Sequence, residues 1–290
     1  MDYLIEQMLA HRDAGTLADK KNSMKEIMQE IVLCGLSRAG FFKTAAFYGG
    51  TVLRIFHGLD RFSEDLDFSL KSAQTGFDFT VYLPALEKEI RSYGLNFRVE
   101  QKEKTYDSDV KSAFLKGSTR EHLLLFYADD AGARSISANE VIRVKLEVDV
   151  NPPEFAHFEH KYQLLPIPYK IALYDMPSLF AGKIHAVLCR AWNNRTKGRD
   201  LYDYVYFLAN RTAVNLPHLM ARLAQTKCAE NANALNLSDI RRLLCERFSS
   251  IDYKQARQDV SPFIRNQNAL DVWSTDFFKQ ITENLREEQQ

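Results

Sequence analysis

Two aspartates one residue apart are the residues of this sequence best placed to do chemistry. Asp65 and Asp67 stand in SEDLDFSL, whose alternating pattern predicts a strand over residues 65–70. Residues two apart on a strand share a face, so the two carboxylates project together while Leu66 and Phe68 face a core. Carboxylates this close repel each other unless a cation lies between them. The pair therefore predicts a site for one or two Mg²⁺ ions.

A third carboxylate is expected on another strand. The segment VIRVKLEVDVN, residues 141–151, alternates most cleanly in the chain and places four charged side chains on one face: Arg143, Lys145, Glu147 and Asp149. Asp149 or Glu147 is the candidate third metal ligand, and Lys145 is a candidate phosphate contact. Two bound metals could activate an attacking hydroxyl and stabilise a leaving pyrophosphate. The alternative is an exposed ladder of cross-strand ion pairs.

A glycine pair precedes the aspartates. Gly49 and Gly50 follow a short predicted strand at 44–48 and open a predicted helix at 51–57. Glycine lets the backbone turn sharply and lie close to a ligand, and the free N–H groups of a helix start attract anions. The order of turn, short helix and Asp-x-Asp strand favours binding of a triphosphate. An isolated Asp-x-Asp is more typical of a solvated strand face.

The segment GKIHAVLCRAWNNRTKGRDLYDYVYFL, residues 182–208, carries a second group of charges. Lys183 and Arg190 are seven residues apart, so they lie on one face of a predicted helix. Asp200 and Asp203 begin the next helix, where acids ordinarily complement the helix dipole. Lys183 is a candidate phosphate contact. The basic turn could contact RNA phosphates through Arg190, Arg195, Lys197 and Arg199.

The remaining elements place these residues in a mixed α/β half followed by a helical half. The predicted helices of the first half cover 2–11, 19–38 and 82–94, and its further strands cover 96–104 and 122–128. Prolines punctuate the chain near 165–176, which favours a domain boundary there. Five helices are predicted beyond it, at 176–192, 199–210, 216–225, 237–248 and 274–285, with Ser238 and Ser274 as N-caps.

Overall composition indicates which broad classes of protein the chain can belong to. The 290 residues carry 38 basic and 38 acidic side chains, so only a local patch could attract nucleic acid. Four scattered cysteines predict neither a zinc knuckle nor a disulfide framework, and Cys189 reads as a small core residue. No signal peptide or membrane span is expected, and the default expectation is a reducing cytoplasm.

Three blocks together resemble the nucleotidyltransferase AbiEii/AbiGii toxin family, which includes abortive-infection toxins and the related MenT tRNA-modifying toxins. The blocks are GGTVLRIFHGLDRFSEDLDF, VKLEVDVNPP and FAGKIHAVLCR…KGRDLYDYVYFL, and the resemblance covers residues from about 20 to 210. It implies an α+β fold: a polymerase-β-like nucleotidyltransferase core with a mixed sheet in residues 1–170, and a C-terminal helical bundle in 171–290.

The resemblance also implies roles for individual residues. Gly49 and Gly50 match the turn of the family's first motif, in which Gly50 replaces a frequent serine, and Ser63 is the candidate for the missing hydroxyl. Thr51 completes the expected nucleotide-binding turn. The metal carboxylates match Asp65 and Asp67, with Asp149 or Glu147 as the third. A phosphate-binding lysine and an essential aspartate match Lys183 and Asp200.

The expected function is therefore a Mg²⁺-dependent nucleotidyltransferase toxin that moves an NMP from an NTP to an acceptor. The resemblance implies an RNA acceptor, the 3′ end of tRNA, and a cognate antitoxin encoded nearby. A non-catalytic nucleotide- or RNA-binding module on the same fold is the alternative, and intact paired carboxylates argue against it. A metal-dependent phosphohydrolase or nuclease is disfavoured by the lack of a His-Asp metal cluster in the sequence.

Overall fold

A computed structural model describes residues 3–12, 15–74, 76–102, 110–118, 121–122, 126, 136–137, 139–191 and 196–288. The chain divides into two compact units. The first comprises Met1–Thr51, Glu64–Pro152 and His160–Leu173, and the second comprises Val52–Ser63, Pro153–Glu159 and Tyr174–Gln290. Each unit is described by itself.

The first unit is built on a mixed sheet. Within the described residues, seven strands follow the order β3-β4-β5-β2-β1-β7-β6. β2 pairs antiparallel with β1 and parallel with β5, while β4 pairs antiparallel with β3 and β5. The bounds are β1 Ala45–Tyr48, β2 Leu66–Leu70, β3 Arg98–Lys102, β4 Val110–Ser118, β5 Val141–Asp149, β6 Phe158–Gln163 and β7 Tyr169–Tyr174.

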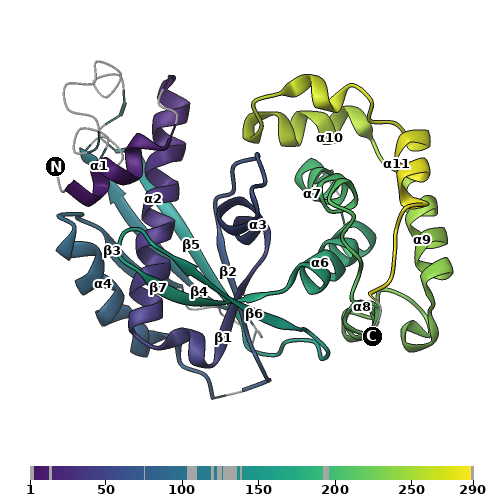
Figure 1. Cartoon of the computed structure of the whole chain (residues 1–290), viewed down its shortest axis with the longest axis horizontal. Helices are drawn as coiled ribbons and strands as arrows, with labels where there is room; N and C mark the ends of the chain where they lie inside the picture. Colours follow the sequence, from purple (N-terminus) through teal and green to yellow (C-terminus); the bar gives the residue numbers. More distant parts are fainter. Residues whose placement is uncertain are drawn as a thin grey trace. The chain divides into compact units, whose positions relative to one another are not determined.

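Helices cover one face of this sheet. They are α1 Tyr3–Ala10, α2 Leu17–Arg38 and α4 Leu83–Ser92, with short 3₁₀ turns at Phe41–Lys43 and Phe79–Tyr82. Helix α3, Gly50–His57, begins in this unit, and its residues from Val52 onward belong to the second unit. α2 lies across the sheet and packs on α4 and β5 (Figure 1). A capping box at Thr16 and Asp19 satisfies the first N–H groups of α2. The core under α2 includes Leu66 and Phe68, which are fully buried.

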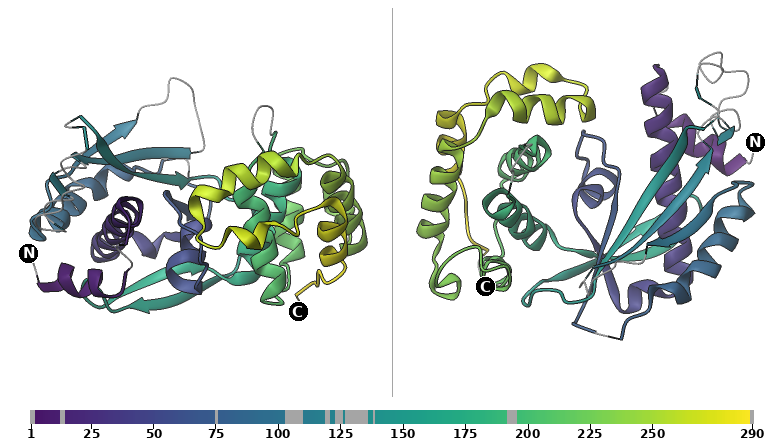
Figure 2. Two further views of the ribbon diagram at one scale, coloured as in Figure 1. Left: turned by 90° about the horizontal axis from the view of Figure 1, so that it is seen from above. Right: turned by 180° about the vertical axis from the view of Figure 1, so that it is seen from behind.

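The second unit is mainly helical. α6 packs on α7, α8 and α9, and α7 packs on α10 and α11 (Figures 1 and 2). Its core is rich in aromatic rings, among them Phe180, Tyr204, Phe207, Phe248 and Phe278. The helix bounds are α6 Met176–Cys189, α7 Gly198–Ala209, α8 Leu216–Gln225, α9 Leu237–Ser249, α10 Tyr253–Val260 and α11 Thr275–Thr282, with 3₁₀ turns at Ala232–Ala234, Ser261–Phe263 and Gln267–Leu270.

The predicted fold class, α+β with a mixed sheet, is confirmed, and all the predicted helices are present with ends that shift by a few residues. Three strands, β4, β6 and β7, and helix α10 were not predicted. The strand predicted at 122–128 is wrong in its described part, because His122 and Phe126 are helical. Ser274 is an N-cap as predicted, whereas Asn236 caps α9 in place of Ser238.

The cysteine prediction is also wrong. Cys189, at the end of α6, forms a disulfide with Cys228, which follows α8, and it is half-buried rather than a core residue. The helices packed around α6 bring the two Cα atoms to 5.6 Å across a sequence separation of 39 residues. That distance lies within the ordinary range for a disulfide. Among the described residues, no helix combines the length and apolarity needed to cross a membrane.

Candidate functional site

The glycine turn rests directly on a carboxylate. Gly49 lies between β1 and α3 with φ of +86°, a conformation that side chains with a Cβ rarely adopt. A Cβ added at Gly49 would lie 2.5 Å from Oδ2 of Asp67, because Tyr48 is the register partner of Asp67. Only glycine therefore lets the start of α3 approach Asp67 this closely. The free N–H groups at that start favour negative charge there.

The two predicted aspartates lie at the start of β2. Asp65 immediately precedes the strand and Asp67 lies within it, while Leu66 between them is buried. Thr51, itself buried, donates its hydroxyl hydrogen bond to the backbone carbonyl of Asp65. The Thr51 hydroxyl thus anchors the backbone that carries the first aspartate. Ser63 is also buried and belongs to the second unit.

Strand pairing separates the two candidates for the third carboxylate. Glu147 is the register partner of Asp67 across the parallel β2–β5 pair, whereas Asp149 is the partner of Ser69. Paired residues on neighbouring strands share a face, so Glu147 lies beside Asp67. β5 ends at Asp149, whose Oδ1 accepts a 3.0 Å hydrogen bond from the backbone N–H of Asn151. The register therefore favours Glu147 as the neighbour of the aspartate pair.

A lysine lies among these carboxylates. Nζ of Lys145 is 2.7 Å from Oε2 of Glu147. Partial burial lowers the pKa of Lys145, but the hydrogen bond and charge of Glu147, with the charges of Asp65 and Asp67, raise that pKa overall. The face thus attracts a cation. An all-oxygen donor set of carboxylates is the kind that Mg²⁺ prefers, so the residues present fit this ion.

The second unit holds a network of charges around two buried aspartates. Nζ of Lys183 lies 2.8 Å from Oδ1 of Asp200 and 2.8 Å from Oδ2 of Asp203. Arg190 donates to Oδ2 of Asp200 at 2.7 Å, and Arg61 donates to both oxygens of Asp203 at 2.5 and 2.6 Å. Three cations therefore surround two carboxylates, which leaves one positive charge in excess.

The network fixes the charge state of its aspartates. Burial raises the pKa of Asp200, but the charge of Lys183 and then that of Arg190 lower it overall. Burial likewise raises the pKa of Asp203, and the charges of Arg61 and Lys183 outweigh this effect. Both carboxylates are consequently ionised at neutral pH, and Lys183 is held in one position by two of them.

Arg61 was not predicted from the sequence. Its side chain is almost fully buried and forms a two-point pair with Asp203, which is 142 residues away in the chain. A signal for such a cation was present on α7. Asp200 and Asp203 recur at the helical spacing of the buried residues Tyr204 and Phe207. Carboxylates on the apolar, buried face of a helix need cations buried beside them. The interpretation that Asp200 and Asp203 only complement the helix dipole was therefore incomplete.

Two of the four predicted RNA contacts already have other partners. Arg190 pairs with Asp200, and the Arg199 guanidinium lies 4.3 Å from the ring centroid of Phe263 and 4.0 Å from Asp259. Arg195 lies outside the described residues. Lys197 directly precedes α7 and is half-buried.

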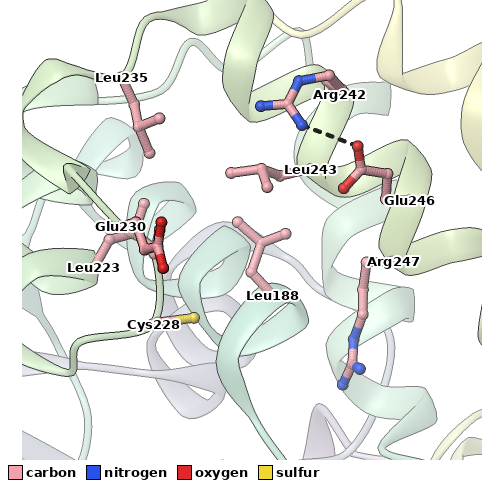
Figure 3. A pocket seen from close by; sticks show the side chains of 10 residues that line it. Leu188, Leu223, Cys228, Glu230, Leu235, Arg242, Leu243, Glu246 and Arg247 are labelled. Atoms are coloured by element: carbon pink, nitrogen blue, oxygen red, sulfur yellow. Dashed lines mark hydrogen bonds and ion pairs between the residues drawn. The ribbon is translucent and has the colours of Figure 1, made fainter.

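Two other features of the second unit contain none of the predicted site residues. His157, Asp175 and Glu288 place one potential ligand atom each within 4.8 Å of the others. Nδ1 of His157 lies 3.7 Å from Oδ2 of Asp175 and 3.6 Å from Oε2 of Glu288. A cavity of about 440 Å³ lies beside Cys228, where leucine side chains meet the Arg242–Glu246 ion pair (Figure 3).

The chain matches a known protein family over most of its length. The family model described as "Nucleotidyl transferase AbiEii toxin, Type IV TA system" matches residues 31–280. Two solved structures are similar at a TM-score of 0.42: a candidate nucleotidyltransferase from H. pylori, 16% identical with 88% of each chain covered, and JHP933 from Helicobacter pylori, 17% identical with 90% of this chain and 86% of that chain covered. Likeness at that score carries no further argument. No curated protein matches the chain.

Proposed function

We propose a reaction for this chain, which belongs to the nucleotidyl transferase AbiEii toxin family of type IV toxin–antitoxin systems: the transfer of an NMP from an NTP to an acceptor hydroxyl. The acceptor we propose is the 3′ end of tRNA. The observation that supports this reaction most directly is the convergence of Asp65, Asp67 and Glu147 on one face of the sheet, with the Gly49 turn against Asp67.

In this reaction the acceptor oxygen attacks the α-phosphorus of the NTP. A new P–O bond forms, the bond from the α-phosphorus to the bridging oxygen of the β-phosphate breaks, and pyrophosphate leaves with the bonding electron pair. The hydroxyl proton passes to water. Mg²⁺ held by Asp65, Asp67 and Glu147 would activate the hydroxyl and neutralise the developing charge.

The chain's own residues supply position and charge. The start of α3 at Gly50 offers free N–H groups to the phosphates, and Thr51 fixes the backbone of Asp65. Lys145 neutralises phosphate charge beside the proposed metal carboxylates. Lys183, whose ammonium group Asp200 and Asp203 hold in place, is proposed as a further phosphate contact because it matches the family's phosphate-binding lysine. Asp149 remains the alternative third ligand. The proposed setting is the cytoplasm, where tRNA and NTPs occur, with a cognate antitoxin as partner.

The test uses purified protein, Mg²⁺, total tRNA and each of the four α-labelled NTPs separately. The variants are Asp65→Ala and, as a matched control, Asp271→Ala at an exposed position. We expect one NTP to label the RNA with the wild type and with the control variant but not with Asp65→Ala. Transfer retained by Asp65→Ala would refute the assignment.

Two further outcomes lead to the other candidate functions. NTP binding without transfer to tRNA, protein or small acceptors would favour a non-catalytic binding module. Loss of full-length RNA in the absence of NTP would favour a nuclease. Omission of Mg²⁺, or its removal by EDTA, is expected to abolish the transfer.

A further inference from the structure

A cavity of about 510 Å³ lies in the first unit where β2 and β5 begin. Residues of α2, β4 and β5 line it, and Asp65 is among the residues of its wall. Its volume falls in the range of small-ligand pockets and suits a nucleotide rather than a folded protein segment. The cavity therefore opens a route to the first aspartate of the proposed metal site.

Cations of two elements line this cavity. Lys21 and Lys25 lie one turn apart on α2, and Arg143 and Lys145 share a face of β5. Arg143 is exposed, and no carboxylate in the described part of the chain forms an ion pair with it. These side chains can meet consecutive phosphates of a nucleic acid backbone.

The α2 cations form ion pairs that a phosphate can replace. Nζ of Lys21 is 2.7 Å from Oε1 of Glu140, and Nζ of Lys25 is 3.0 Å from Oε1 of Glu64. All four side chains keep between 24% and 40% of their surface exposed. Exposed pairs of this kind contribute about 1 kcal/mol or less, so exchanging the carboxylate for a phosphate costs little.

An aromatic ring completes the lining. Phe114 of β4 is the register partner of Lys145, so its ring lies on the same face as the charged side chains of β5. The ring is half-buried, although an apolar side chain of this size is usually placed in a core. An accessible ring beside phosphate-binding cations is the combination that binds a base of single-stranded RNA by stacking.

Sheet order indicates which substrate the cavity receives. β2 lies between β1 and β5, so the Gly49 turn and the start of α3 lie on one side of Asp67 and the cavity lies on the other. In-line phosphoryl transfer requires the attacking oxygen and the leaving pyrophosphate to be on opposite sides of the phosphorus. With the triphosphate at the glycine turn, the acceptor enters from the cavity.

We infer that this cavity holds the 3′-terminal nucleotide of a single-stranded RNA acceptor, with the base on Phe114 and the adjoining phosphates at Arg143, Lys21 and Lys25. This inference rests on the proposed function and adds the acceptor site to it. It moves the main RNA contact away from the basic turn at 190–199, where Arg190 and Arg199 already have partners.

The test measures RNA binding separately from catalysis. A fluorescently labelled single-stranded RNA decamer with a free 3′-hydroxyl is titrated with the full chain, without NTP, and anisotropy is recorded. The variants are Phe114→Leu, which keeps apolar bulk but removes the ring, and Arg143→Gln. The controls are Tyr162→Ala, a 70% exposed aromatic residue on β6, and Arg91→Gln, an exposed arginine on α4.

We expect each cavity variant to weaken RNA binding about tenfold, in line with the loss of one stacking or phosphate contact, while the controls change it less than twofold. In the transfer assay the same variants should raise KM for tRNA and leave KM for the NTP unchanged. A decamer that fails to bind the wild type, or binds all variants equally, would overturn the inference, and so would an equal rise in both KM values.

The two proposals can fail independently. RNA binding that depends on Phe114 and Arg143 without any transfer would support the cavity and refute the transferase reaction. Transfer to a protein acceptor that is unaffected by Phe114→Leu would support the transferase reaction and refute the RNA site.

Discussion

The guanidinium of Arg61 and the carboxylate of Asp203 form a two-point ion pair in which both side chains are at most 3% exposed. Removing one partner of such a pair leaves an uncompensated buried charge. Asp203→Ala removes this carboxylate from both Arg61 and Lys183. We therefore expect it to lower the free energy of unfolding by about 3–5 kcal/mol. Urea denaturation followed by circular dichroism measures the change.

The matched control for Asp203→Ala is Glu246→Ala. Glu246 pairs with Arg242 at 2.9 Å, but both side chains are about 60% exposed. Exposed pairs contribute about 1 kcal/mol or less, so this variant should differ little from the wild type. Equal destabilisation by the two variants would show that the Arg61–Asp203 pair does not depend on burial for its effect.

The Gly49 position makes a second prediction. Gly49→Ala should reduce transfer about 100-fold, because the added Cβ meets Asp67 and displaces a carboxylate that must be positioned within about 1 Å. Gly94→Ala is the control, since Gly94 also has a positive φ, of +72°, but a Cβ there meets nothing within 4 Å. Both variants share the cost of the left-handed conformation, about 1–2 kcal/mol.

The comparison between the two glycine variants isolates the contact with Asp67. Unfolding free energies measured by denaturant titration should fall for both, whereas kcat should fall only for Gly49→Ala. If the activity of Gly94→Ala falls as far, backbone strain rather than the Asp67 contact explains the requirement for glycine.

Local pattern predicted much of the fold and part of the candidate site. The alternation of apolar and charged residues over 141–149 assigned the side chains of β5 to the correct faces. Which face of a strand is buried can be read from the sequence of that strand alone. The choice between Glu147 and Asp149 stayed open, since the register with β2 joins segments about 80 residues apart. Pairing of strands depends on the whole sheet and not on either strand alone.

Long-range contacts account for the remaining errors. Arg61 and Asp203 meet through the packing of α7, and Cys189 meets Cys228 through that of α6 and α8. The spacing of Asp200 and Asp203 on α7 indicates that a buried cation is needed but does not identify Arg61, and the spacing of the cysteines does not indicate their pairing. β7, with the sequence YKIALY, is almost entirely buried, so it lacks the polar alternation by which β2 and β5 were predicted.

The strand register yields a third prediction, which concerns the metal ligands. Glu147→Gln should lower kcat about 100-fold and raise the Mg²⁺ concentration needed for half-maximal activity, because it removes the carboxylate beside Asp67. Asp149→Asn should keep activity within about threefold, because the amide oxygen can still accept from Asn151. Binding of Mn²⁺, measured by electron paramagnetic resonance, reports the same difference without turnover. The opposite pattern would identify Asp149 as the third ligand.

A buried histidine makes stability depend on pH. Burial, followed by the charge of Arg222, lowers the pKa of His218 to about 4, and its Nδ1 lies 2.7 Å from the backbone carbonyl oxygen of Glu154. The unfolded chain has the ordinary pKa of about 6.5. Between these values the unfolded state binds a proton that the folded state does not, so lowering the pH favours unfolding.

The expected size follows from that difference. Between pH 7 and pH 5 His218 should reduce the free energy of unfolding by about 2 kcal/mol, and this stability is fully present above the unfolded pKa. His185, whose pKa is also lowered to about 4 by burial and then by Arg222, adds to the slope. His218→Gln should flatten the dependence measured by urea titration at each pH, whereas the exposed control His11→Gln should leave it unchanged. An unaltered slope in His218→Gln would mean that folding does not lower the pKa of His218.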